Sequence, residues 1–149
     1  MSQKRLPYGV AYSPNEITDL GQFLPVADFL DDMKYTDIRY VRVQWVDFSN
    51  HIRYKVLSRS YFSKLVSRSG RPGITLAAAV MSIIAGACAP GSTGIGEWLY
   101  VFDLQTLRRA EYNPGHAVVM GYFQEETPHL TRGLYIPLCP RSILKKVVE

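Results

Sequence analysis

The chain has 149 residues, of which 47% are hydrophobic and 12% aromatic, so it is long and apolar enough to bury a core of its own. Seventeen Lys and Arg residues against thirteen Asp and Glu give a formal charge of +4, spread along the chain in pairs such as Arg108–Arg109 and Lys145–Lys146. A protein disordered throughout and a basic nucleic-acid-binding tail are both unexpected from this composition.

Membrane insertion and export are not expected either. The longest uncharged apolar segment, residues 73–96, is rich in Ala and Gly and is interrupted by Pro90, and the N-terminus has no apolar stretch of signal-peptide length. Cys88 and Cys139 lie far apart, without a spacing typical of disulfide frameworks or zinc sites. These features indicate reduced thiols and a cytoplasmic protein.

The chain opens on residues 1–20, which show no sustained period and are expected to be a flexible leader. Residues 22–35 are predicted to form a helix, because Phe23, Ala27, Leu30 and Met33 recur three or four residues apart.

An antiparallel hairpin is predicted next. Apolar and polar residues alternate over 39–46 and again over 51–57, and residues 47–50 supply the turn. We expect one apolar face, carrying Ile52, Tyr54 and Val56 with the apolar residues of the first strand, and one cationic face that carries Arg53 and Lys55.

The remaining elements alternate between helix and strand. Residues 58–70 predict a helix with Ser58 or Ser60 as cap and Gly70 as its end, and it should cross over the sheet. Residues 74–84 predict one buried strand, followed by a mobile Gly/Pro-rich loop that could be functional. Strands are predicted over 97–104 and 116–124, and Pro140 starts a last helix.

This order predicts an α+β fold, most economically a β-grasp-like mixed sheet with a crossover helix, preceded by an N-terminal helix and followed by the start of a C-terminal linker helix. The domain should span 21–138, and residues 139–149 should begin the linker helix. The pattern by itself leaves other two-layer folds open.

Candidate chemistry is sparse in the residues themselves. The glycines near residue 94 lack the lysine and following helix of a phosphate-binding loop. His51, His116 and His129 have no metal-ligand spacing, and no nucleophile sits in a catalytic context. We therefore predict no metal site and no catalytic residue in this chain.

Three segments together resemble the N-terminal part of glutamine synthetases and related γ-glutamyl ligases. They are "VRVQWVDFSNHIRYKVL", "VFDLQTLRRAEYNPGHAVVMGYF" and "LCPRSILKKVVE". The corresponding family patterns are roughly V-x-x-x-x-x-D-x-x-G-x-x-R-x-K, D-x-x-T-x-R-x-x-P-W and C-P-R-x-x-L. The match runs from about Ile38 to the last residue, and is closer to the divergent glutamine-synthetase-like proteins of fungi than to the housekeeping enzyme.

The resemblance implies a β-grasp N-terminal domain whose C-P-R helix leads into a larger catalytic domain that is absent from this chain. It also implies a role in nitrogen metabolism and glutamine biosynthesis, ATP and Mg or Mn as cofactors of the full-length protein, and assembly into homo-oligomeric rings. The partner of this domain would be the catalytic domain of its own or a neighbouring subunit, with no nucleic acid and no membrane. Each active site would lie between two subunits, so only half a site is expected here.

The resemblance also carries over site positions. The substrate loop aligns with Thr75, Ala77, Ala78 and Ala79, and Ala77 stands where glutamine synthetases have the aspartate that binds and deprotonates ammonium. Alanine can do neither, which favours a bulkier amine or no ligation at all. Arg53 and Lys55 occupy the R-x-K positions and are candidates for ligand or subunit contacts.

Three functions are therefore in competition. The first is half of a γ-glutamyl ligase that is inactive alone, in which an amine displaces phosphate from γ-glutamyl phosphate. The second is a structural or regulatory assembly domain of a relative that has lost catalysis. The third, a basic RNA-binding module, lacks a stacking motif.

Overall fold

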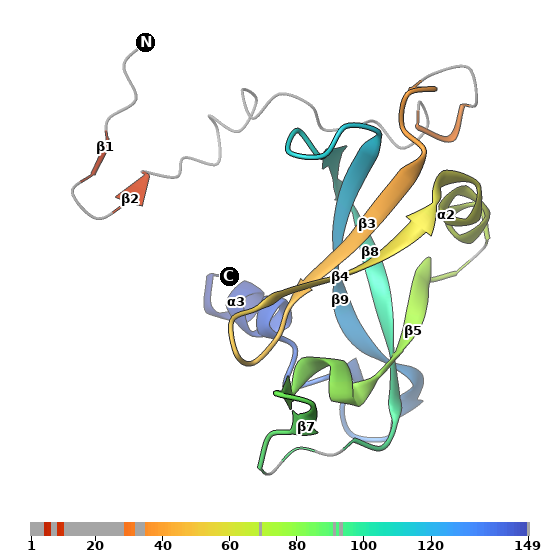
Figure 1. The fold of residues 1–149 in the computed structure, drawn as a ribbon. Coiled ribbons are helices and arrows are strands. Elements are labelled where there is room, and N and C mark those ends of the chain that lie inside the picture. The colour runs from red at the N-terminus through yellow and green to blue at the C-terminus, as the bar shows by residue number, and fades with distance from the viewer. Residues whose placement is uncertain are drawn as a thin grey trace.

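A computed structural model describes residues 5–6, 9–10, 29–31, 35–68, 70–90, 92 and 94–148. Its central feature is a six-stranded sheet in the order β4-β3-β9-β8-β5, with β10 paired to β9 (Figure 1). The strands are β3 (Tyr40–Val46), β4 (Ile52–Ser58), β5 (Gly73–Ala77), β8 (Glu97–Arg109), β9 (His116–His129) and β10 (Gly133–Tyr135). The pairing of β3 with β9 is parallel and the others are antiparallel, so the sheet is mixed.

The crossover helix is α2 (Arg59–Val66), which begins directly after β4. Ser58 caps it, since its hydroxyl accepts the backbone N–H of Tyr61. Phe62 and Leu65 are its buried residues, and the Phe62 ring packs on Phe102 of β8 with 5.1 Å between centroids. The hairpin, the crossover helix and the parallel central pair confirm the predicted α+β, β-grasp-like fold.

The core lies along the inner positions of β3, β8 and β9. Val41, Val43 and Trp45 are buried on β3, and the Tyr100 ring contacts those of Trp45 and Phe123 in tilted arrangements, with centroid distances of 5.8 and 4.6 Å. Alternation on β3 thus marks its buried face as expected.

The predicted faces of the hairpin are wrong for β4. Val46 pairs with Ile52, so Val43 and Trp45 lie opposite Lys55 and Arg53 and share their face of the sheet. Ile52, Tyr54 and Val56 therefore point to the other side, where they are exposed, whereas Leu57 lies opposite Val41 and is buried. The register explains the error, because directly paired residues project to the same face whatever their polarity.

The single strand expected over 74–84 is also wrong. β5 ends at Ala77, and a 3₁₀ helix η2 (Ala78–Met81) follows it. The chain then forms a short hairpin in which β6 (Ile83–Ile84) and β7 (Ala87–Cys88) pair antiparallel. Its turn residues, Ala85 and Gly86, both have positive φ, the requirement of a tight hairpin turn. Part of the expected mobile loop is thus regular structure.

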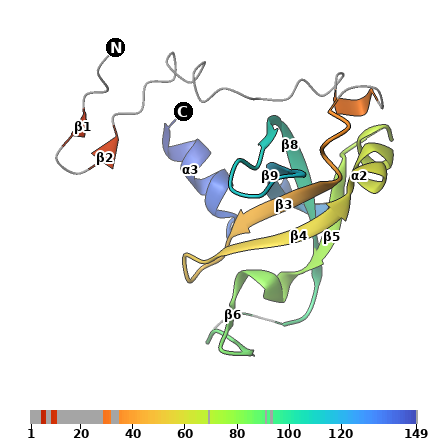
Figure 2. The ribbon, with the colours of Figure 1, turned by 45° about the horizontal axis from the view of Figure 1, so that its top comes forward.

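The last helix is confirmed as α3 (Pro140–Val148). Cys139 is buried directly before α3, and its backbone carbonyl accepts the N–H of Ile143, while no residue of α3 itself is buried. α2 and α3 lie at opposite ends of the β3–β4 hairpin (Figures 1 and 2).

The N-terminal expectations fall mostly outside the described residues. In the leader, β1 (Arg5–Leu6) pairs with β2 (Gly9–Val10), an element that the sequence did not predict. Of the helix predicted over 22–35, Phe29 and Leu30 are helical, Asp31 and Tyr35 are not, and the rest lies outside the described part of the chain. None of the described helices is both long enough and apolar enough to cross a membrane.

Candidate functional site

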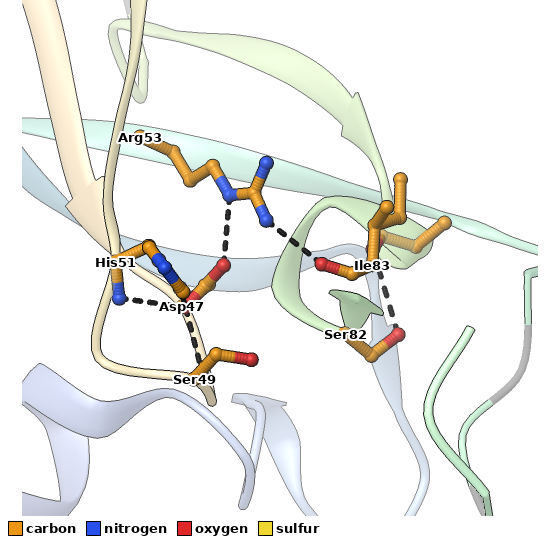
Figure 3. A network of polar contacts seen from close by, with 7 residues as sticks. Asp47, Ser49, His51, Arg53, Ser82 and Ile83 are labelled. Carbon is orange, nitrogen blue, oxygen red and sulfur yellow. Dashed lines mark hydrogen bonds and ion pairs between the residues drawn. The ribbon is translucent and has the colours of Figure 1, made fainter. Parts of the chain in front are cut away.

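The turn between β3 and β4 is built around the carboxylate of Asp47. This side chain is buried, and its Oδ1 accepts the backbone N–H groups of Ser49 and His51 at 2.9 Å each. Its Oδ2 accepts Nε of Arg53 at 2.7 Å (Figure 3). Burial would raise the pKa of the Asp47 carboxyl, but the bonds from His51, Arg53 and Ser49 outweigh it, and the pKa is lowered. Asp47 is therefore an ionised, internally neutralised group at neutral pH.

Asn50 completes this turn with a φ of +61°. It stands at the glycine position of the D-x-x-G-x-x-R-x-K pattern. Asparagine is one of the few residues that tolerate this left-handed conformation, so the turn forms here without a glycine.

Arg53 connects the turn to the segment that follows η2. Its Nη2 donates to the carbonyl of Ile83 at 2.8 Å, and Figure 3 shows the guanidinium lying between Asp47 and Ile83. The Phe48 N–H also donates to the Met81 carbonyl at 2.9 Å. The structure thus gives Arg53 a positioning task, holding the β3–β4 turn against η2 and β6.

The predicted substrate-loop positions lie at the end of β5 and in η2. Thr75 is exposed and donates to Oε1 of Glu126 at 2.7 Å. Ala77 is exposed as the last residue of β5, opposite Glu97. Ala78 is buried, and its N–H donates to the Gly96 carbonyl, while Ala79 is half-buried.

Of the two cationic candidates, Arg53 is bonded to Ile83 of β6, which follows η2 in the chain. Lys55 is exposed on β4, opposite Val43. The structure brings the alanine segment and Arg53 into one region at the η2 end of the hairpin, and it leaves Lys55 along the strand.

A second polar junction joins β8 to the start of α3. Nη2 of Arg141 donates to Oδ2 of Asp103 at 2.9 Å, and the guanidinium lies over the Tyr122 ring at 4.6 Å. Asp103 is the aspartate of the D-x-x-T-x-R pattern, and Arg141 is the arginine of C-P-R. The ion pair thus connects two segments that are 38 residues apart and sets where α3 leaves the sheet.

Thr106 of the same pattern closes an irregularity in β8. The register with β9 shifts between Asp103 and Arg108. Within the shift, the Thr106 hydroxyl donates to the Asp103 carbonyl at 2.7 Å and accepts the Met120 N–H at 2.9 Å. These bonds satisfy backbone groups that the bulge leaves outside the regular ladder.

Asp47, Asp103, Thr106 and Arg141 were not singled out from the sequence. Each is a fixed letter of a family pattern, which was the available signal, but their spacing along the chain does not show that they bond to one another. Only the fold pairs Asp47 with Arg53 and Asp103 with Arg141.

No group of three His, Cys, Asp or Glu side chains that could hold a metal ion occurs among the described residues. The described part of the domain therefore offers no set of ligands that fits the Mg or Mn implied by the resemblance. The ionised groups at the η2 end, Asp47 and Arg53, instead hydrogen-bond to each other and to backbone groups of the turn and of Ile83.

The solved structures that this chain resembles include two of GmaS. A structure described as conformation 1 of the GmaS/ADP complex matches 80% of this chain and 24% of its own, with a TM-score of 0.56 and 17% identity. The structure of apo GmaS without ligand matches 74% of this chain and 22% of the GmaS chain, with a TM-score of 0.51 and 18% identity. No protein-family model and no curated protein matches the sequence. This chain thus shares the fold of a domain that makes up about a quarter of GmaS.

Proposed function

We propose that this chain is the N-terminal domain of a glutamine-synthetase-like γ-glutamyl ligase and contributes half of an active site shared between subunits. The observation that carries the proposal is the fold likeness to GmaS, a glutamine-synthetase-like γ-glutamylmethylamide synthetase. The sequence patterns support it independently, because their charged residues form the two junctions that shape the domain.

The reaction under this proposal joins glutamate to an amine at the expense of ATP. Nucleotide and metal would be held by the catalytic domain, in keeping with the ADP complex of GmaS. The contribution of this chain would be the alanine segment Ala77–Ala79, at the end of β5 and the start of η2, while Arg53 anchors the chain after η2 at Ile83.

The amine is proposed to be organic. A carboxylate at position 77 would attract ammonium and accept its proton, whereas the exposed methyl group of Ala77 removes that attraction and leaves room for an alkyl substituent.

A second candidate is an assembly domain of a relative that has lost catalysis. The alanine at position 77 favours this candidate too, because glutamine synthetases use a carboxylate there for ammonia and Ala77 has none. The two candidates differ in whether any amine is turned over.

The test is ADP release with glutamate, ATP, magnesium and a panel of amines. The 149-residue chain alone should stay at background, because its described residues offer no metal ligands. The complete product of the gene should form a γ-glutamyl amide with an alkyl amine. Turnover by the chain alone that survives repurification would contradict the half-site proposal, and inactivity of the complete product with every amine would favour the assembly domain.

A further inference from the structure

The loop of residues 110–115, which joins β8 to β9, is attached to the β3–β4 hairpin through Arg42. The Arg42 guanidinium lies over two tyrosine rings, 4.6 Å from the centroid of Tyr54 on β4 and 5.7 Å from that of Tyr112 in the loop. Nε2 of Gln44 also donates to the Tyr112 hydroxyl at 2.8 Å. Arg42 and Gln44 thus hold Tyr112 against the exposed face of the hairpin.

His116, at the start of β9, bonds Arg42 in turn. Its ring stacks on that of Tyr40 with 5.1 Å between centroids, and its Nδ1 accepts Nε of Arg42 at 3.3 Å. The Asn113 carboxamide satisfies its neighbours when its oxygen faces them, because this oxygen then accepts Nη2 of Arg42 at 2.6 Å and Nε2 of His116 at 3.3 Å. These bonds assign the His116 proton to Nε2 and leave Nδ1 as an acceptor, which is the arrangement of a neutral imidazole.

The surroundings of His116 favour this neutral form. Burial, together with the positive charge of Arg42, lowers the pKa of His116. Arg108 of β8 lies opposite Val118, two residues along β9 from His116, so it is on the same side of the sheet and adds a second positive charge there.

Two carboxylates at this end of the sheet act on a different arginine. Asp37 forms an ion pair with Arg109, and Glu111 acts with Asp37 to raise the pKa of Arg109. Arg109 lies opposite Ala117, so it is on the other side of the sheet from His116. A proton added to His116 would therefore meet cationic neighbours.

We propose that His116 is an acid-sensitive latch: when its imidazole takes up a proton, Nδ1 no longer accepts Arg42, and the 110–115 loop separates from the hairpin. Protonation replaces an acceptor by a donor, and it places a positive charge beside the guanidinium. Arg42 then leaves this bond, and its contact with Tyr112 weakens. The latch goes beyond the proposed ligase function, since none of the residues of the proposed half-site takes part in it.

Nuclear magnetic resonance of the 149-residue chain tests the latch in a titration from about pH 8 to 5. The chain has three histidines, and His116→Asn identifies the His116 ring signals by their loss. The His116 ring should titrate below the ordinary histidine value of about 6.5, and the amide signals of Tyr112 and Asn113 should move with the same midpoint. A midpoint at or above 6.5, or loop amides that do not follow the ring, would overturn the proposal.

Hydrogen exchange separates opening of the loop from a change of charge alone. His116→Asn keeps an acceptor near the position of Nδ1 and cannot take up a proton. The Asn113 N–H donates to the Ala110 carbonyl at 2.8 Å inside the loop. About one pH unit below the His116 midpoint, it should exchange about tenfold faster in the natural chain than in His116→Asn, and above the midpoint equally fast. Equal exchange on both sides of the midpoint would refute the latch.

A second variant tests the link between His116 and Arg42. Arg42→Leu should raise the pKa of His116, because the guanidinium that opposes the added proton is gone. The control is Lys55→Leu, which removes a positive charge from the other side of the hairpin, where Lys55 lies opposite Val43, and should leave the midpoint unchanged. A midpoint that Arg42→Leu leaves in place, or that Lys55→Leu moves as far, would contradict the latch. This comparison decides the matter even if His116→Asn fails to fold.

Discussion

At the scale of single residues, Asp47 replaces its lost hydration with bonds from its own turn. Three hydrogen-bond donors surround this one buried carboxylate. Two of them are the backbone N–H groups of Ser49 and His51, and the third is the Arg53 guanidinium. Buried charges persist in proteins only with such compensation. The stability of the β3–β4 turn should therefore depend on this side chain.

Asp47→Asn should lower the free energy of unfolding by about 2 kcal/mol, since the backbone bonds weaken and Arg53 loses its counter-charge. Urea unfolding followed by circular dichroism measures the change. The control is Asp37→Asn, which breaks the exposed ion pair with Arg109 and should cost less than about 1 kcal/mol. Equal effects of the two substitutions would contradict the structural role of Asp47.

The same carboxylate should make stability depend on acid pH. Its pKa is lower in the folded than in the unfolded chain, so the unfolded state binds protons first as the pH falls. The stabilisation is complete above the ordinary Asp pKa of about 3.9 and is lost as the pH falls through the lower, folded pKa. The stability difference between the natural chain and Asp47→Asn should thus be constant from pH 7 to about 5 and shrink below about 4. A difference that grows on acidification would be inconsistent with a lowered pKa.

At the scale of elements, the Thr106 hydroxyl stabilises the irregular part of β8 by hydrogen-bonding to backbone groups there. Thr106→Val preserves the shape of the side chain and removes the hydroxyl that bonds Asp103 and Met120, so the free energy of unfolding should fall by about 1–2 kcal/mol. Chemical denaturation gives the value. Thr75→Val removes an exposed bond to Glu126 and should be nearly neutral. A neutral Thr106→Val would mean that water replaces the hydroxyl.

The elements were predictable where local signals decide them. The Ser58 cap of α2 and Pro140 at the start of α3 are local signals, and both helices formed, although α2 ends at Val66 and not at the predicted Gly70. The faces of β4 were not predictable from alternation, because the register with β3 decides which set of residues turns inward.

The candidate site was predictable only in part, for the same physical reason. The pattern places Arg53 and the alanine segment in the sequence, but the bonds of Arg53 to Asp47 and Ile83 depend on how a hairpin meets a segment 30 residues later. The junction of Asp103 with Arg141 is a product of folding as well. Neither leaves a periodic signal in the chain.

At the scale of the whole molecule, α3 presents apolar side chains that the described chain does not cover. Val147 and Val148 are each 77% exposed, and exposed apolar groups favour association. The chain should self-associate at high concentration, and Val147→Ser with Val148→Ser should reduce this in analytical ultracentrifugation. Leu130→Ser, at a fully exposed position on the β9–β10 turn, is the control and should change nothing. If the natural chain stays monomeric at every concentration, the exposed apolar side chains of α3 do not mediate association.

The central claim is that this domain shapes a ligase active site through the segment at Ala77. The most direct test is the ratio of kcat/KM for methylamine to that for ammonia, in the complete gene product and in its Ala77→Asp variant. Ala77 is exposed with an extended backbone at the cap of η2, a position that suits aspartate, so the variant should fold. We predict a ratio above one that falls at least about tenfold in Ala77→Asp, since a restored carboxylate attracts ammonium. Efficient use of ammonia by the natural protein, or a ratio that Ala77→Asp leaves unchanged, would contradict the claim.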